Sequence, residues 1–498
     1  MRAVLATAIS AAVLGVEAYE VLVEVGINRG LPTLLIVGLP DAAVQESRER
    51  VRAAINNAGL PFPTSRIIIN LAPAHIKKEG PAFDLPIAIA LLAAQGIIPK
   101  QALTDTVISG ELALNGTLRP VRGAINIGLF AAQKRYRRLL IPPANSAEVA
   151  LAQTETLDVL APQSLDQAVS YLQGNLELPP ILPTSTQPVQ STLDLVDIKG
   201  QAAAKRALEI TASGSHNLLM KGPPGSGKTM LAQRLPSILP NLSQHEAIEV
   251  TRIHSTAGIL KQSGLITHPP FRSPHHTISD AGLIGGGTIP RPGEVSLAHN
   301  GVLFLDELPE FNRRALEVMR QPLEDGVVTI SRARAVLTFP ARFMLIASQN
   351  PCPCGFYGDS DRLCSCTPPM RQRYSARLSG PLLDRIDLRI NVPQLSAEEL
   401  LHIPPGESSE QLRHRIAAAR ILAVKRQGRP NAQLTGQALH RHAYLKAGPQ
   451  DFAKRIIKQL WLSGRGFDRL LRVARTIADL AGEEFIDETH LAEASSYR

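Results

Sequence analysis

Residues 222–229 have the composition of a loop that binds phosphate groups. They read Gly222-Pro223-Pro224-Gly225-Ser226-Gly227-Lys228-Thr229 and fit the pattern G-x-x-x-x-G-K-[ST]. Glycines let backbone N–H groups turn toward phosphate oxygens. Lys228 would then reach the β- and γ-phosphates of ATP, and Thr229 would bind Mg²⁺. A loop rich in Gly and Pro can also be a plain turn, but the Lys and Thr at this spacing favour a nucleotide site.

Two acids with matching chemistry end the apolar run 302–305. Asp306 would hold Mg²⁺, and Glu307 would polarise the attacking water. Acids are common after strands, so the pairing with the phosphate loop is what favours a catalytic role. A further apolar run, 343–348, leads to Asn350. Its amide could orient the water against the γ-phosphate, or it could simply cap a turn.

Arg385 lies between Asp384 and Asp387 in the sequence. One interpretation is a local salt bridge with these neighbours. The other is an arginine finger, which neutralises transition-state charge in the site of a neighbouring subunit. The residue types alone leave both open.

The elements around these residues indicate an α/β core. The run 218–220 reads as a buried strand before the phosphate loop, and 230–235 reads as a helix after it. We therefore predict an α/β ATPase domain over 195–392. After about residue 392 strand-like runs end and helical periodicity takes over at 410–427, 450–462 and 469–480, which predicts a helical domain over 393–498.

A separate domain is expected over residues 1–173, followed by a linker over 174–194 that is rich in Pro, Ser, Thr and Gln. The predicted elements of the domain over 1–173 include both strands and helices. The strands are expected at 21–25, 34–37, 67–70, 107–112 and 139–141, and the helices at 41–57, 85–95 and 124–134.

The composition is that of an ordinary globular protein, with 498 residues, 44% hydrophobic and 19% charged. This length predicts two or three domains. The net charge of +9 permits a polyanionic partner without requiring one. Residues 1–15 are apolar but lead into acids, so we expect a buried strand there and not a signal peptide. No apolar run is long enough to span a membrane, and a cytoplasmic location is expected.

Four cysteines lie close together in the sequence, Cys352, Cys354, Cys364 and Cys366. Four thiolates are a ligand set for tetrahedral Zn²⁺. The C-x-C spacing is tighter than the usual C-x-x-C, so a surface loop with free thiols is the competing interpretation. Zinc would brace the loop after Asn350 and would take no part in catalysis.

In this order, the phosphate loop, the acidic strand end, Asn350, Arg385 and the helical domain resemble an AAA+ ATPase. Longer strings are similar to the magnesium-chelatase-like branch, and within it to the ComM/YifB family. These strings are 37–41 (VGLPD), 78–86 (KEGPAFDLP), 271–277 (FRSPHHT), 283–287 (LIGGG), 350–355 (NPCPCG) and 473–480 (VARTIADL). The resemblance implies an AAA+ P-loop core with a helical lid, preceded by a Lon-protease-like (ribosomal S5 domain 2-like) α+β domain.

The resemblance also implies a homo-oligomeric ring, expected to be a hexamer, that hydrolyses ATP between subunits. Its expected partner is single-stranded or branched DNA, bound without sequence preference by a helicase that drives branch migration of transforming DNA. The stretch 327–337 fits the pore hairpin of related ATPases, with Arg332 and Arg334 at its basic tip. Arg465 is the lid arginine expected to contact nucleotide, with Arg469 or Arg472 as alternatives.

The first domain lacks the residues of a Lon-type peptidase. Such an enzyme needs a nucleophilic Ser after a Gly-Pro pair and a Lys to activate it. Ala82 follows Gly80-Pro81, and Ile125 stands at the Lys position. We therefore expect no peptidase activity, and Lys78 is one of several basic residues that could instead contact DNA or only be surface charges.

Two other functions stay open. The chain could be a chelatase-like or chaperone-like ATPase that remodels a protein partner, or an ATP-dependent protease. Salt-sensitive binding to single-stranded DNA would distinguish a DNA motor from a remodelling ATPase, because counterion release accompanies phosphate contacts.

Overall fold

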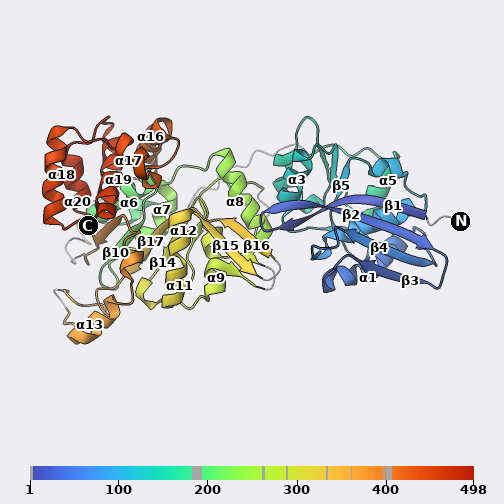
Figure 1. Cartoon of the computed structure of the whole chain (residues 1–498), viewed down its shortest axis with the longest axis horizontal. Coiled ribbons are helices and arrows are strands. Elements are labelled where there is room, and N and C mark those ends of the chain that lie inside the picture. The colour runs from blue at the N-terminus through green and yellow to red at the C-terminus, as the bar shows by residue number, and fades with distance from the viewer. Residues whose placement is uncertain are drawn as a thin grey trace. The chain divides into compact units, whose positions relative to one another are not determined.

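The computed structural model describes residues 4–181, 193–260, 264–287, 290–332, 335–359, 362–395, 399 and 406–498. The chain forms two compact units, one of residues 1–187 with 247–266 and one of residues 188–246 with 267–498. Each unit combines helices with a β-sheet (Figure 1). Most of the predicted linker 174–194 lies outside the described residues.

The first unit is built on a seven-stranded mixed sheet of order β3-β4-β2-β1-β5-β8-β9. Strands β1 and β2 pair antiparallel along their whole length, and β5, β8 and β9 run parallel to one another. Alternate residues of these strands are buried, as expected for a sheet covered on one face. The strands are β1 (Val4–Leu14), β2 (Glu17–Asn28), β3 (Thr33–Val37), β4 (Arg66–Ala72), β5 (Thr106–Ile108), β8 (Arg138–Leu140) and β9 (Asp158–Leu160).

Helices of the first unit follow the predicted pattern. Val44, Val51 and Ile55 form the buried stripe of α1 (Ala42–Asn57), and Asp41 caps it by accepting a 2.8 Å hydrogen bond from the Val44 amide. The other helices are α2 (Asp84–Ala94), α3 (Ala124–Gln133), α4 (Ser146–Val149) and α5 (Leu165–Leu172). All residues of α2 are buried, which confirms the prediction of a core helix.

The single strand predicted over 107–112 is wrong. The chain leaves the sheet after β5, and β6 (Glu111–Leu112) pairs instead with β7 (Leu118–Arg119) in a small hairpin. Gly110 explains the break, because its amide donates to Ala82 (3.0 Å) and its carbonyl accepts from the Leu85 amide (3.0 Å). These bonds serve the start of α2 and not the sheet.

Residues 247–266 lie with the first unit, although the sequence placed them inside the predicted range 195–392. They include most of α8 (Gln244–Ala257). Within the unit, Arg252 donates to Asn126 (2.8 Å) and Ser255 donates to the buried carboxylate of Glu148 (2.5 Å). Two buried polar residues of this unit, Asn126 and Glu148, thus find partners on α8.

The second unit contains a five-stranded parallel sheet of order β11-β14-β17-β10-β18. Its strands are β10 (Leu218–Lys221), β11 (Phe271–Arg272), β14 (Val302–Leu305), β17 (Met344–Gln349) and β18 (Leu388–Asn391). The predicted strands at 218–220, 302–305 and 343–348 are confirmed. Because the strands are parallel, their carboxyl ends meet at one edge of the sheet.

Helices surround this sheet and continue after it. Those before or between the strands are α6 (Ala202–Gly214), α7 (Lys228–Ile238), α9 (Asp280–Ile284), α10 (Glu294–Leu297), α11 (Arg313–Val318), α12 (Arg320–Asp325), α13 (Pro368–Ser375) and α14 (Gly380–Leu383). The helical region that follows has α16 (Ser409–Gln427), α17 (Gly436–His442), α18 (Ala447–Gln459), α19 (Gly464–Ala481) and α20 (Glu488–Ser495). Its predicted helices are confirmed by α16, α18 and α19, and one apolar core joins it to the sheet.

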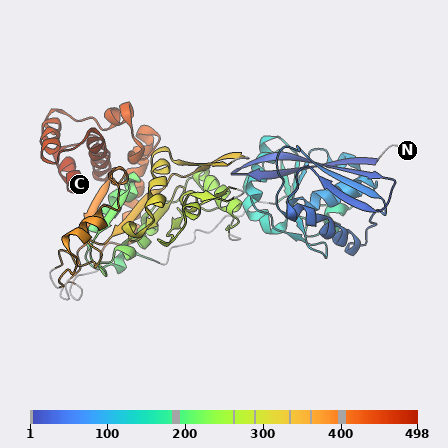
Figure 2. The same ribbon diagram turned by 60° about the horizontal axis from the view of Figure 1, so that its bottom comes forward.

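Three small hairpins complete the two units: β6–β7, β12 (Gly285–Gly286) with β13 (Arg291–Pro292), and β15 (Val327–Arg332) with β16 (Ala335–Pro340). The last confirms the hairpin predicted at 327–337 and runs along the edge of its unit (Figure 2), with Val328, Ile330, Leu337 and Phe339 buried. Across the described part of the chain, none of the helices combines the length and apolar composition needed to cross a bilayer.

Candidate active site

The phosphate loop links β10 to α7 with a backbone that only glycine suits at several positions. A Cβ on Gly222 would lie 2.2 Å from the Val392 carbonyl oxygen, and Gly225 and Gly227 have φ of 79° and 89°. The helix begins immediately afterwards at Lys228. Its unpaired N–H groups and positive dipole end therefore face the loop, as an anion site requires.

Lys228 is buried inside this loop, with 7% of its surface exposed. Its ammonium group donates to the Gly222 and Pro223 carbonyl oxygens, both at 2.8 Å. Burial lowers the pKa of Lys228, while the charges of Asp306 and Glu307 act in the opposite direction. A phosphate group would supply the opposite charge that this cation lacks within the loop.

Asp306 accepts hydrogen bonds from two hydroxyl groups on different strands and helices. Thr229 at the start of α7 donates to one carboxylate oxygen at 2.8 Å, and Ser348 on β17 donates to the other. The sheet register explains the contact, because Leu305 pairs with Ala347 and Met220 pairs with Ser348. The carboxylate is thus fixed beside the phosphate loop.

Glu307 and Asn350 lie at the ends of the neighbouring strands β14 and β17. The Asn350 side-chain amide donates to the Glu307 carboxylate at 3.4 Å, and the Glu307 backbone amide donates to Ser348 at 3.0 Å. Glu307 has φ of 54°, a strained value for a non-glycine residue. This turn directs its side chain toward Asn350 and not along the strand.

The structure brings the predicted hydrolytic residues together, apart from Arg385. A cavity of about 350 Å³ is lined by Pro224, Gly225, Gly227, Lys228, Thr229, Met230, Asp306, Glu307 and Asn350. The Thr229 hydroxyl and the Asp306 carboxylate, in hydrogen-bond contact, offer the hard oxygen ligands that Mg²⁺ prefers. The loop, the buried Lys228 and these two oxygens fit a nucleotide with its metal.

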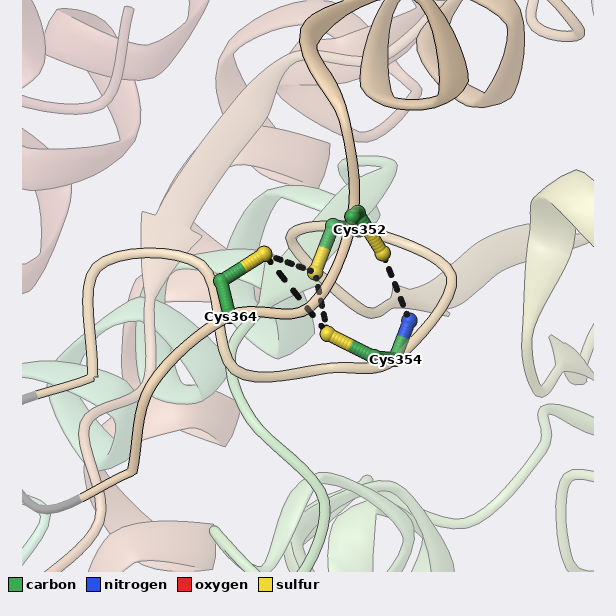
Figure 3. A group of neighbouring side chains, drawn as sticks. Cys352, Cys354 and Cys364 are labelled. Atoms are coloured by element: carbon green, nitrogen blue, oxygen red, sulfur yellow. Dashed lines mark hydrogen bonds between the residues drawn. The ribbon is translucent and has the colours of Figure 1, made fainter.

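The four cysteines also meet in space, on the loop between β17 and α13. The Cys352 sulfur lies 3.3 Å from that of Cys354 and 3.6 Å from that of Cys364, and the thiols point toward a common centre (Figure 3). Cys366 completes the group, and all four sulfurs lie within 4.8 Å of one another. Tetrahedral zinc with Zn–S bonds of 2.3 Å places its sulfurs about 3.8 Å apart, so this set fits the metal.

This cysteine loop touches the phosphate loop. A Cβ on Gly355 would lie 2.5 Å from Pro224, so the two loops are in direct contact. Hydrogen bonding from the Phe356 backbone lowers the pKa of Cys354 to about 5, whereas burial and the neighbouring thiols raise the pKa of Cys352. Bracing of the cysteine loop would therefore also restrain Pro224.

Arg385 lines a different cavity, of about 460 Å³, and its partner is Glu324 of α12. The local salt bridge with its sequence neighbours, one of the two interpretations of Arg385, does not form. Asp384 instead pairs with Arg469 (3.2 Å), and Asp387 lies near His216 (3.5 Å). The residues follow the last turn of α14, where successive side chains point in different directions.

Helix α19 holds the segment that carries Arg385. Arg469 is 6% exposed and donates to the Leu383 and Ile386 carbonyl oxygens at 3.3 and 3.2 Å. The Asn217 amide donates to the Arg385 carbonyl oxygen at 2.8 Å. Arg469, an alternative to Arg465 for a nucleotide contact, is thus occupied by this segment.

Arg465 lies on the Arg385 side of the unit. Its charge helps to lower the pKa of Glu324, after the larger effect of the hydrogen bond from Arg385. Among the described residues that line the phosphate-loop cavity, Arg465 does not occur. A contact between Arg465 and nucleotide bound in its own subunit therefore has no support from this arrangement.

The remaining predicted residues are outside this site. Arg334 and the side chain of Arg332 lie outside the described residues. Lys78 is fully buried, where its ammonium donates to the Ile76 carbonyl oxygen at 2.8 Å, so it is no surface contact for DNA. Ile125 is also fully buried, and Ala82 packs beside an apolar cluster of the first unit.

Sequence reasoning missed Ser348 and Glu324. Ser348 lies two residues before Asn350 at a strand end, and the strand register would have placed it beside Asp306. Glu324 is one of two acids on α12 and carries no motif. Only its contact with Arg385 distinguishes it.

Three stretches of the chain match families of one enzyme subunit. Residues 194–400 match the family described as magnesium chelatase, subunit ChlI. Residues 23–145 match subunit ChlI of Mg-chelatase, and residues 406–498 match the C-terminal region of that subunit. Together they cover most of both units.

Full-length relatives are similar over nearly the whole chain. The protein YifB of Escherichia coli K12 is 46% identical over 490 residues, which are 98% of this chain and 96% of YifB. Competence protein ComM of Haemophilus influenzae is 46% identical over 508 residues, 99% of this chain and 97% of ComM.

A partial similarity is also found. Lon protease 2 of Bacillus subtilis is 32% identical over 148 residues, 28% of this chain and 26% of that protein.

Proposed function

Because the chain belongs to the ComM/YifB family of magnesium-chelatase-like AAA+ ATPases, we propose that it is an ATP-driven ring motor that moves along DNA. Its task is helicase-driven branch migration during recombination of transforming DNA. The observation that carries the ATPase part is the convergence of Lys228, Thr229, Asp306, Glu307 and Asn350 on one cavity.

Each of these residues has a distinct role in hydrolysis. Lys228 binds the β- and γ-phosphates through its ammonium group, while Thr229 and Asp306 hold Mg²⁺. When bound, Mg²⁺ neutralises charge on the phosphate oxygens. Glu307 polarises the attacking water and Asn350 orients it, because their side chains contact each other at the rim of the cavity.

Arg385 completes the site of a neighbouring subunit in this proposal. Arg385 lines a different cavity from the one at the phosphate loop, so a second copy of the chain must bring Arg385 to the nucleotide. A closed ring lets every subunit give one arginine and receive one. We propose six subunits, with Arg465 on the same arginine-giving side.

The DNA part of the proposal draws on three supports. The relative in Haemophilus influenzae carries the name competence protein. The chain has a net charge of +9, and the hairpin β15–β16 has Arg332 and Arg334 in the sequence of its tip. Two arginines can grip phosphates without reading base sequence.

Two further assignments belong to this proposal. The four cysteines bind structural Zn²⁺, which keeps the cysteine loop against Pro224. The first unit has a Lon-protease-like fold without peptidase chemistry, because Ala82 and Ile125 stand at the two catalytic positions.

The test is the ATPase rate with and without single-stranded DNA, at low and at high salt. A DNA motor should be stimulated strongly, and the stimulation should fade as salt rises, because phosphate contacts release counterions. Arg332→Ala with Arg334→Ala should remove the stimulation and keep the basal rate. The matched control is Arg429→Ala with Lys458→Ala, two exposed cations elsewhere.

Absence of stimulation at both salt concentrations would contradict the DNA motor and favour an ATPase that remodels a protein partner. Loss of stimulation in the control pair as well would show that general positive charge, and not the hairpin, attracts the DNA.

A further inference from the structure

The guanidinium group of Arg385, which would bind a phosphate group in an assembled ring, is bound by the carboxylate of Glu324 in the single subunit. Its guanidinium donates to the carboxylate of Glu324 and to the Pro381 carbonyl oxygen at 2.7 Å. The arginine side chain is 15% exposed, whereas that of Glu324 is 58% exposed. The acid thus covers the cation from the solvent side.

Charges of both signs surround Glu324, because Arg320, Arg385, Glu317 and Asp325 line the same cavity. The pKa of Glu324 is lowered first by the hydrogen bond and charge of Arg385, and further by the charges of Arg465 and Arg320. Arg320 itself pairs with Glu317 at 2.9 Å. Arg385 is thus the arginine of this cavity that Glu324 pairs with in the single subunit.

The backbone of Arg385 is fixed independently of Glu324. Asn217 binds its carbonyl oxygen, and Arg469 binds the carbonyl oxygens of Leu383 and Ile386 on either side. A change of partner therefore requires only rotation of the arginine side chain, which is fast compared with movement of packed elements.

We infer that Glu324 is a positioning residue that holds Arg385 in the unassembled subunit and releases it to the γ-phosphate of ATP bound by the next subunit. This inference rests on the proposed ring with Arg385 acting between subunits. Exposed ion pairs are weak, and a phosphate offers more charge and more acceptor oxygens, so the exchange favours the nucleotide once the subunits meet.

The hairpin β15–β16 lines the same cavity as this pair. Val328 and Thr329 of β15 line the cavity that holds Arg385 and Glu324. When Arg385 leaves Glu324 for a phosphate group, the charge of this cavity therefore changes beside Val328 and Thr329. This contact gives the hairpin a direct route for sensing the state of the neighbouring nucleotide site.

The test mixes two inactive full-length variants. Arg385→Ala subunits keep their phosphate loop and lack the arginine, whereas Lys228→Ala subunits give an arginine and cannot hydrolyse. Their mixture should recover ATPase activity. Glu324→Gln on the Lys228→Ala subunit should raise this activity about threefold near the assembly midpoint, within the roughly fivefold range of exposed ion pairs.

The matched control places Glu324→Gln on the Arg385→Ala subunit, where no arginine needs release, and should change nothing. An equal effect in both placements, or none in either, overturns the role of Glu324. A mixture without recovered activity would instead overturn the exchange between subunits, so the two failures are distinguishable.

A second readout follows assembly and not hydrolysis. With ATPγS, Glu324→Gln in the otherwise native chain should form rings at about threefold lower protein concentration, measured by sedimentation velocity. Without nucleotide the two proteins should assemble alike, because no γ-phosphate competes for Arg385. A shift of the same size without nucleotide would overturn the inference.

Discussion

The side-chain amide of Asn350 lies 3.4 Å from the carboxylate of Glu307, and the two residues follow the neighbouring parallel strands β17 and β14. Glu307 and Asn350 are 43 residues apart in the sequence. Their meeting at the rim of the phosphate-loop cavity makes Glu307 the carboxylate best placed to act on an attacking water.

Glu307→Gln should lower the ATPase turnover by roughly 100-fold or more, because an amide cannot accept a proton from water. Binding of ATP should remain, since the phosphate loop is unchanged. Turnover and nucleotide affinity measured on the same variant check this. Glu310→Gln, an acid on the same turn that pairs with Arg377, serves as the control and should keep its activity.

Arg469→Ala should lower ATPase activity by about 10- to 100-fold while ATP binding remains, because two backbone carbonyl oxygens of the Arg385 segment lose their guanidinium donor and the segment shifts. Thermal unfolding shows whether the variant is folded. Arg455→Ala on the exposed face of α18 is the comparison. A parallel loss of ATP binding would mean that Arg469 itself contacts nucleotide, contrary to its contacts in the structure.

The purified protein should contain about one zinc ion per chain, measured by elemental analysis, and Cys364→Ser should lose it. Removal of the metal with a chelator should also weaken ATP binding, because the cysteine loop supports Pro224. Ser365→Ala, between two of the thiols, is the matched control. Reduced protein with four reactive thiols and no metal would establish a free-thiol loop instead.

Asp387 should stabilise the second unit in a pH-dependent manner. Burial raises its pKa, but the nearby His216 ring, the charge of Arg472 and the hydrogen bond from the Asn217 backbone amide (3.1 Å) outweigh this and lower the pKa to about 2. A pKa below the ordinary 3.8 means that the stabilisation is complete above about pH 4 and is lost as pH falls through about 2.

Asp387→Asn should therefore lower the free energy of unfolding by about 2 kcal/mol at pH 7. The difference from the native chain should shrink between pH 4 and pH 2. Urea unfolding at several pH values measures it. A difference that is constant over this range would mean that packing, and not the charge of Asp387, provides the stabilisation.

Much of the site could be predicted from the sequence, because its chemistry depends on residues that are close along the chain. The pattern 222–229 specifies the loop, and Asp306-Glu307 directly follows an apolar run that can only be a buried strand. Parallel strands then bring these ends together at one sheet edge. The helices α16, α18 and α19 follow from a periodicity that is equally local.

Only the tertiary structure decided which residues from distant segments are partners. The sequence offered Asp384 and Asp387 to Arg385, yet the fold pairs it with Glu324, 61 residues away. In the fold, Arg465 also lies on the Arg385 side of its unit. The strand ends before Gly110, because the backbone groups of Gly110 form hydrogen bonds with residues at the start of α2. Such choices depend on the directions of side chains and on unsatisfied backbone groups, which arise only when the elements pack.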